Sequence, residues 1–199
     1  MIKNDREYRN TGLFETRSEG EKRIVTGYAT TFEPYLMHEY SDGEKWFEHI
    51  VPGAFDECDM SDVVFLKDHT GTVLARTKNG ALILNVDEHG LHTLSDLSRT
   101  EAAREMYEEI EAQNYTQMSI SFVVDRDEFI QEGLNITRRI LSVRKLYDVS
   151  AVAFPANSGT DIGVSYRDLF NGEIERIKTE RSKAINERER LRLRLRLMR

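Results

Sequence analysis

Short runs of residues that are apolar, or that alternate between apolar and polar, recur along the chain as they do in β-strands. They lie at residues 24–32, 46–51, 63–66, 81–86, 91–94, 115–124 and 136–154. The run at 63–66 is apolar throughout, which fits a short buried strand. Turn residues at 87–90 join two of the runs and predict a hairpin. We therefore predict that residues 23–166 are rich in strands.

Two helices are predicted among these strands. A short one, at residues 54–58, follows a Pro-Gly break in the chain. A longer one begins after Thr100, which can cap it, and runs to about residue 113. Its apolar residues recur at helical spacing and form one stripe: Ala103, Met106, Tyr107 and Ile110. Residues 33–43 are rich in turn-forming residues and are predicted to be a loop.

The composition changes near Asp168, and we place a domain boundary between residues 1–167 and 168–199. The second segment is interpreted as a charged C-terminal helical tail, and its last nine residues alternate leucine with arginine until Met198. Residues 173–199 hold ten Lys or Arg and five Asp or Glu, a local charge of +5. Since the whole chain carries −7, the remainder carries −12. A solvated helix that ends in a frayed strand is one interpretation of this tail.

Length and charge exclude several classes of protein. The 199 residues suit one domain of ordinary size with an appendage. No apolar run approaches the roughly 20 residues of a membrane span, and the first five residues contain no apolar secretory core. The acidic body is a poor binder of nucleic acid, because affinity for phosphate needs clustered cations. We therefore expect no membrane and no nucleic-acid partner, and a protein that stays inside a cell or an assembling particle.

The single cysteine, Cys58, excludes an internal disulfide. It lies among carboxylates in residues 56–59, which are expected to raise the pKa of its thiol and to disfavour the thiolate. We therefore interpret Cys58 as a buried or incidental thiol rather than as a nucleophile.

Residues 117–122, QMSISF, predict a strand with two different faces. Its apolar residues would face the core, while Ser119 and Ser121 would lie together on the other face. Such a strand is a rigid platform for a nucleophile, and rigidity matters because a misplacement of about one ångström can cost about 100-fold in rate. An amphipathic strand with two solvent-facing serines fits the same pattern. The pattern does not choose between Ser119 and Ser121.

A serine nucleophile needs a base, and the chain has five histidines: His38, His49, His69, His89 and His92. Of these, His69 directly follows the apolar strand at 63–66, where a rigid scaffold often displays functional side chains. The candidates for an acid that orients the base are Asp68, Asp96 and Asp148. Asp68 adjoins His69, and neighbours in a chain rarely face each other. Asp148 lies in an apolar strand, where a carboxylate is costly to bury without a partner.

His89 and His92 raise a second hypothesis, a metal-dependent hydrolase. Their spacing suits metal ligands on a helix, and Gly90 and the strand pattern argue against a helix there. No cluster of Cys, His and Asp completes a metal site. The sequence also has no G-x-S-x-G elbow, phosphate-binding glycine loop or C-x-x-C pair. The residues alone therefore lead to a β-rich domain with a candidate Ser/His site and no metal.

Four segments, in order, resemble motifs of the prohead proteases of HK97-type tailed phages. Residues 47–55, FEHIVPGAF, resemble the family's E-x-I-x-P-G-A-F stretch. Residues 64–69, VFLKDH, resemble its apolar strand that ends in the catalytic histidine. Residues 117–122 resemble its M-S-I-G-F strand, whose serine is the nucleophile. Residues 146–157, LYDVSAVAFPAN, resemble L-x-E-V-S-x-V-x-x-P-A-N.

The resemblance implies a set of catalytic residues, and the reaction that it implies needs no cofactor. Ser119 aligns with the nucleophile, whereas Ser121 replaces a glycine of the family motif. His69 aligns with the general base. Asp148 replaces the usual glutamate, one methylene longer, as the orienting acid. The resemblance therefore selects Ser119 over Ser121.

The resemblance also implies a fold and an oxyanion site. The family is thought to share the fold of the herpesvirus assemblins, so we expect a β-rich α+β domain built as a β-barrel surrounded by helices. Those relatives work as dimers, so a homodimer is a further expectation. Backbone N–H groups, with Arg138 or Arg139 as additional candidates, would stabilise the oxyanion.

The function implied is that of a serine endopeptidase of capsid maturation. It would cleave the scaffold region and extensions of the phage major capsid protein, and itself, in the host cytoplasm and the interior of the procapsid. The tail at 168–199 would then be a targeting or self-cleaved extension. The rival hypothesis is a non-catalytic scaffold or capsid-assembly protein of the same fold, which would need neither Ser119 nor His69.

Overall fold

The computed structural model describes residues 6–19 and 22–153, with five separate positions beyond them: Arg176, Thr179, Lys183, Glu187 and Arg190. The predicted boundary near Asp168 and nearly all of the predicted tail lie outside the described residues. No helix in the described part of the chain has the length and apolar character needed to cross a membrane.

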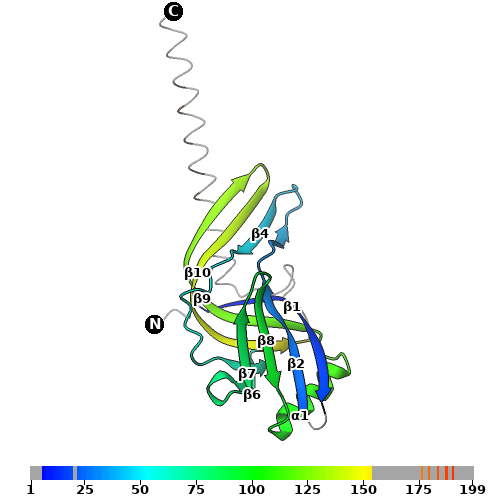
Figure 1. The fold of residues 1–199 in the computed structure, drawn as a ribbon. Helices are drawn as coiled ribbons and strands as arrows, with labels where there is room; N and C mark the ends of the chain where they lie inside the picture. Colours follow the sequence, from blue (N-terminus) through cyan, green and yellow to red (C-terminus); the bar gives the residue numbers. More distant parts are fainter. Residues whose placement is uncertain are drawn as a thin grey trace, which may run out of the picture. The chain divides into compact units, whose positions relative to one another are not determined.

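Residues 6–19 and 22–153 form a sheet of ten strands with one α-helix (Figure 1). The strands are β1 (Glu7–Glu19), β2 (Lys22–Thr31), β3 (Tyr35–Glu39), β4 (Lys45–Ile50), β5 (Val64–Lys67), β6 (Thr70–Arg76), β7 (Leu82–Val86), β8 (Gly90–Asp96), β9 (Gln117–Glu132) and β10 (Asn135–Val152). The helix is α1 (Glu101–Glu111), and a short 3₁₀ helix, η1, spans Thr77–Asn79. Neighbouring strands follow the order β3-β4-β10-β9-β1-β2-β8-β7. Outside this order, β5 pairs with β10, and β6 pairs with β5.

The expected β-barrel surrounded by helices is wrong. The end strands β3 and β7 are not neighbours, so the sheet is not closed. Within residues 6–19 and 22–153, α1 is the one α-helix, which is too little to surround a barrel. Alternation of residues identifies a strand in an open sheet and in a barrel alike, because closure depends on which strands pair. The barrel was implied by the resemblance alone, and the pattern of the sequence could not test whether the sheet closes.

The longest strands, β9 and β10, form an antiparallel hairpin of 16 and 18 residues. Figure 1 shows that the end of the hairpin next to its turn runs beside β4, while the opposite end lies among the other strands. Several register shifts, as between Ile140 and Ser142, interrupt the pairing of the two strands, and such bulges bend a sheet. Apolar side chains of the sheet and of α1 form a buried core that includes Phe65, Ile120 and Phe122.

The helix and one hairpin confirm the sequence predictions. The hydroxyl of Thr100 accepts a hydrogen bond from the Ala103 N–H at 3.2 Å, so Thr100 caps α1. The four residues of the predicted apolar stripe are the buried residues of α1. β7 and β8 pair as an antiparallel hairpin around the predicted turn.

Two local predictions are wrong. Residues 54–58 do not form a helix: residues 52–57 are turns, and the N–H groups of Ala54, Asp56 and Cys58 each reach back only three residues, as from Ala54 to Val51. The loop predicted at 33–43 contains β3, which pairs with β4. Strand β1 was not predicted at all.

Candidate active site

Two adjacent strands carry four polar residues on one face. Ser119 and Ser121 lie on β9, opposite Ser150 and Asp148 of β10 respectively. Residues that lie opposite each other in a pair of strands share a face of the sheet. Ile120, between the two serines, is fully buried in the core on the other face. The predicted separation of apolar and serine faces is confirmed.

His69 reaches this face from the turn between β5 and β6. β5 runs parallel to β10, and the Asp68 N–H donates to the Ala151 carbonyl at 2.9 Å. The φ angles of Asp68 and His69 are 46° and 56°, the left-handed region that a two-residue hairpin turn requires. For residues other than glycine, this conformation costs about 1–3 kcal/mol, and it is concentrated at functional sites. His69, the predicted base, therefore sits on a strained turn that is anchored to β10.

The three residues predicted to act together meet in the structure. His69 Nδ1 lies 2.5 Å from Asp148 Oδ1, and His69 Nε2 lies 2.6 Å from Ser119 Oγ. A neutral imidazole with its proton on Nδ1 donates to Asp148 and leaves Nε2 free to accept the Ser119 hydroxyl. The His69 side chain is 16% exposed and the Asp148 side chain 5%. This geometry places an imidazole between a serine hydroxyl and a carboxylate, as the predicted roles of nucleophile, base and orienting acid require.

Two further residues, not predicted from the sequence, contact His69. Ser150 Oγ donates to Asp148 Oδ1 at 2.8 Å and lies 3.2 Å from His69 Nδ1. The ring of Tyr8 on β1 meets the His69 ring edge-on, with 4.6 Å between centroids. The sequence held one signal for Ser150, because a residue two positions after Asp148 on a strand shares its face.

Both serines of β9 are fully buried, so the alternative interpretation, in which they face solvent, is wrong. Ser119 has the hydrogen-bond contact with His69. The Ser121 hydroxyl forms no hydrogen bond to any described residue. An unpartnered buried hydroxyl costs about 1–3 kcal/mol. Of the two serines, Ser119 is therefore the one placed beside a base.

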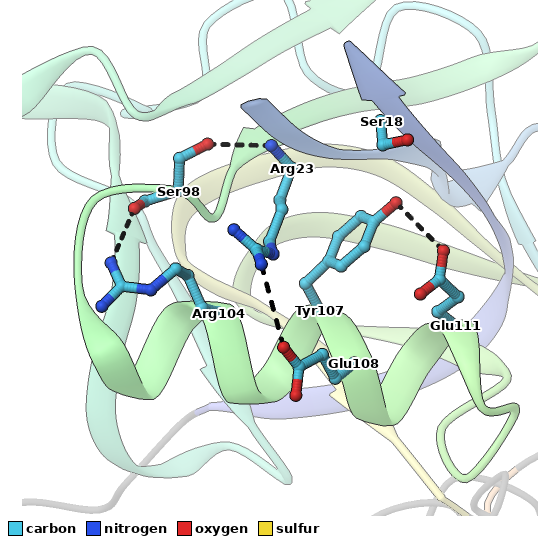
Figure 2. Close-up of a pocket in the computed structure, with 7 residues that line it drawn as sticks. All are labelled: Ser18, Arg23, Ser98, Arg104, Tyr107, Glu108 and Glu111. Carbon is cyan, nitrogen blue, oxygen red and sulfur yellow. Dashed lines mark hydrogen bonds and ion pairs between the residues drawn. The ribbon is translucent and has the colours of Figure 1, made fainter. Parts of the chain in front are cut away.

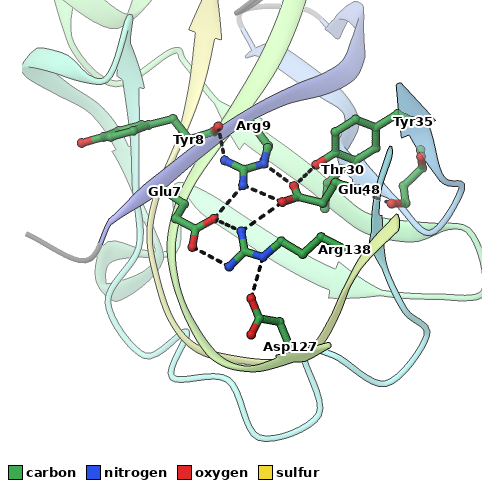
Figure 3. A network of polar contacts seen from close by, with 9 residues as sticks. Glu7, Tyr8, Arg9, Thr30, Tyr35, Glu48, Asp127 and Arg138 are labelled. Carbon is green, nitrogen blue, oxygen red and sulfur yellow. Dashed lines mark hydrogen bonds and ion pairs between the residues drawn. The ribbon is translucent and has the colours of Figure 1, made fainter. Parts of the chain in front are cut away.

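A buried group of charges lies on the opposite face of β9 (Figure 3). Arg9 lies opposite Ile120 in the β1–β9 pair, so it points away from the serines. Arg9 Nη2 donates to Glu48 Oε2 at 2.6 Å, and Arg138 Nη1 donates to the same atom at 3.2 Å. Burial alone would raise the pKa of Glu48, but the guanidinium groups of Arg9 and Arg138 outweigh it and hold this pKa at about 2.

Both arginines that were considered for the oxyanion form ion pairs with carboxylates. Arg138 donates to Asp127 through Nε and to Glu7 through Nη1, both at 2.6 Å, as Figure 3 shows. Arg139 donates to Glu128 at 2.5 Å. These contacts give no support for an arginine at the oxyanion, and that assignment stays a prediction.

The remaining candidate residues have other surroundings. His92 Nε2 lies 3.1 Å from Thr26 Oγ1, and the His89 ring lies 6.0 Å from that of Tyr28. Among the described residues, no three His, Cys, Asp or Glu are grouped so that they could hold a metal ion. Burial raises the pKa of the Cys58 thiol to about 11, with a smaller contribution from Asp59. The predicted rise in the pKa of the Cys58 thiol is confirmed, although burial contributes more to it than the neighbouring carboxylate does.

A pocket of about 590 Å³ lies beside α1, away from the candidate catalytic residues (Figure 2). Its charged side chains already have partners. Arg23 lies 3.9 Å from Glu108, and Arg104 donates to the Ser98 carbonyl at 2.9 Å. None of the three residues of the candidate site lines this pocket.

A comparison with protein families decides the class of the chain. The sequence model of the caudovirus prohead serine proteases matches residues 13–174. The chain belongs to this family. The prohead protease is therefore a serine peptidase with a role in phage capsid maturation, inside the procapsid in the host cell. No curated protein and no solved structure matches the chain. The relation to the herpesvirus assemblins stays a prediction.

Proposed function

We propose that this prohead protease is an endopeptidase in which Ser119 is the nucleophile, His69 the general base and Asp148 the acid that orients the base. The observation that carries the proposal is the continuous contact from Asp148 through His69 to Ser119, at 2.5 and 2.6 Å. All three residues lie within the part of the chain that matches the family, residues 13–174.

In the first half of the reaction, His69 Nε2 takes the hydroxyl proton of Ser119 while Oγ attacks the carbonyl carbon of a peptide bond. The new Oγ–C bond forms as the carbonyl electrons move onto oxygen. The C–N bond then breaks, and Nε2 gives its proton to the leaving amine. Asp148 stabilises the imidazolium that exists between these two proton transfers.

In the second half, a water molecule gives a proton to His69 Nε2 and attacks the acyl carbon. The C–Oγ bond breaks, and the proton returns from Nε2 to Ser119 Oγ, so the enzyme is regenerated. Backbone N–H groups are the proposed donors to the oxyanion, since such donors need no side chain and act where charge develops.

The buried position of Ser119 bears on how the enzyme is controlled. A peptide carbonyl can reach Oγ only after side chains near it move, because Ser119 has no exposed surface. Tyr8, which packs against His69 and is 42% exposed, is one such side chain. We infer that this site opens transiently in the free chain and that the opening, in which the Tyr8 side chain moves, limits the rate of cleavage.

The proposed substrates are the scaffold region and the extensions of the phage major capsid protein, and the protease itself. These substrates are supported by membership in a family that acts in the prohead. The tail at 168–199 stays a predicted targeting or self-cleaved extension, and the homodimer stays a prediction.

The experiment that tests the proposal is co-expression of the prohead protease with the capsid protein of its own phage, followed by intact-mass spectrometry. The wild type is compared with Ser119→Ala, and Ser121→Ala serves as the matched control. We expect shortened capsid protein with the wild type and with Ser121→Ala, and full-length capsid protein with Ser119→Ala. Identical masses in all three samples, with particles assembled, would instead support the non-catalytic scaffold hypothesis.

A further inference from the structure

We propose that Ser150 is a positioning residue of the active site, which holds the carboxylate of Asp148 and the ring of His69 in the reactive arrangement. The inference rests on the proposed function, because it assigns Ser150 a role in the reaction of Ser119. It concerns a residue that stands in the family motif, as the serine of L-x-E-V-S, but to which neither the family match nor the predicted catalytic set gives a role.

Ser150 is placed to contact two members of the catalytic set at once. Its Oγ donates to Asp148 Oδ1 at 2.8 Å and lies 3.2 Å from His69 Nδ1. The same carboxylate oxygen lies 2.5 Å from His69 Nδ1. Three polar atoms, Ser150 Oγ, Asp148 Oδ1 and His69 Nδ1, therefore lie together on the side of the His69 ring that faces away from Ser119.

The position of Ser150 in the sheet explains this convergence. On β10, Ser150 lies two residues after Asp148 and directly opposite Ser119 of β9. Ser150 is fully buried, so water does not compete with its hydroxyl for the carboxylate of Asp148. A hydrogen bond to a charged group is worth more than one between neutral groups, and burial keeps it ordered.

The hydroxyl has two effects on the reaction. As a donor to Asp148, it restrains the carboxylate to the orientation that accepts the Nδ1 proton. It also stabilises the catalytic pair in its deprotonated form, in which the ring is neutral and the net charge is negative. Without this donor, the reactive form of the pair is reached only at higher pH. Among the described residues, the titratable groups that contact or adjoin His69 are Asp148, Tyr8 and Asp68.

Ser121 provides a matched control for Ser150. Both are fully buried serines in the β9–β10 pair, and they share a face of the sheet. Ser121 lies opposite Asp148, yet its hydroxyl has no hydrogen-bond partner among the described residues. Changing either serine to alanine removes one oxygen atom from the same buried layer, but only Ser150→Ala removes a bond to the acid.

The test measures how fast a fluorophosphonate, a serine-directed reagent, modifies Ser119 as a function of pH. The reagent forms an O–P bond with Ser119 and releases fluoride, and the hydroxyl proton passes to His69. We use the full chain as wild type, Ser150→Ala, Ser121→Ala and His69→Ala, follow the adduct by intact mass, and record each thermal midpoint. We expect Ser150→Ala to react about ten-fold or more slowly than the wild type at neutral pH. The midpoint of its acid limb should move to higher pH, while Ser121→Ala keeps the rate and midpoint of the wild type.

The outcomes separate this inference from the proposed function. If the wild type reacts at Ser119 only when His69 is present, and Ser150→Ala reacts with the same rate and midpoint, the positioning role is wrong while the nucleophile assignment stands. Equal losses in Ser150→Ala and Ser121→Ala would also overturn the inference, since they would reflect a general disturbance of the sheet. A wild type that does not react at Ser119, or reacts equally without His69, contradicts the proposed function itself.

Discussion

At the scale of single residues, the acid of the catalytic set differs from the motif it resembles. Asp148 stands where that motif carries glutamate, yet its carboxylate lies 2.5 Å from the His69 ring. The left-handed turn at Asp68 and His69 brings the imidazole to β10, so the shorter side chain is long enough. The strain of this turn is the cost of placing the ring between β9 and β10.

The carboxylate of Asp148 is expected to be needed as an acceptor for the Nδ1 proton. Asp148→Asn leaves the shape nearly unchanged but favours the wrong tautomer of His69, so the initial rate of cleavage of purified capsid protein should fall about 10³–10⁴-fold. Asp148→Glu, which keeps the charge, should lose much less. Equal rates for the Asn and Glu variants would show that the charge of this residue does not matter.

Cys58 is expected to be chemically inert in the folded protein. Because burial raises the pKa of its thiol to about 11, the thiolate at pH 8 should be about 100-fold scarcer than for a free cysteine. Alkylation by iodoacetamide, followed by mass, should be slow in buffer and fast in denaturant. Cleavage activity should survive Cys58→Ser, and rapid alkylation of the native chain would contradict this assignment.

At the scale of elements, the sequence predicted the strands and the helix whose apolar residues have a clear period. Helix α1 and hairpin β7–β8 follow such patterns. Strand β1 has few apolar residues and no alternation, and it exists because it pairs with β2 on one edge and β9 on the other. Local periodicity does not show which distant segments pair, so neither β1 nor the open form of the sheet could be predicted.

The cap of α1 is expected to contribute measurably to stability. Thr100 accepts the Ala103 N–H, and loss of such a cap typically costs about 1 kcal/mol. Thr100→Ala should therefore lower the thermal midpoint by a few degrees, and Thr100→Ser, which keeps the hydroxyl, should restore most of it. Identical midpoints for the wild type and Thr100→Ala would mean that this bond is not important for folding.

At the scale of the molecule, the sheet separates two polar systems. The face of β9 with Ser119 and Ser121 carries the candidate catalytic set, and the opposite face carries the ion-pair group around Glu48. The motifs predicted Ser119, His69 and Asp148 as a set because each motif is a continuous segment. Ser150 stands in the same motif as Asp148 and shares its face of the strand, but its contact with His69 depends on the docking of the turn at residues 68 and 69. Tyr8 lies in no motif, and its proximity to His69 arises from the pairing of β1 with β9.

The ion-pair group is expected to make the fold sensitive to acid. The pKa of Glu48 is about 2 in the folded protein against a usual value of 4.5, so its contribution is complete above pH 4.5 and is lost as the pH falls through 2. The difference corresponds to about 3 kcal/mol of unfolding free energy. Denaturant unfolding between pH 6 and 2 should show this loss. Glu48→Gln should be less stable at pH 6, since it leaves buried guanidinium groups without their carboxylate, and should lack this component of the acid dependence.

The most direct test of the central claim is to locate the covalent adduct of a fluorophosphonate by peptide mapping. The wild-type prohead protease, Ser119→Ala and His69→Ala are treated alike near neutral pH, digested and analysed by tandem mass spectrometry. The account predicts one adduct in the wild type, on Ser119, with none on Ser119→Ala and a strongly slowed reaction for His69→Ala. An adduct on Ser121, or an adduct on Ser119 that forms equally fast without His69, would contradict it.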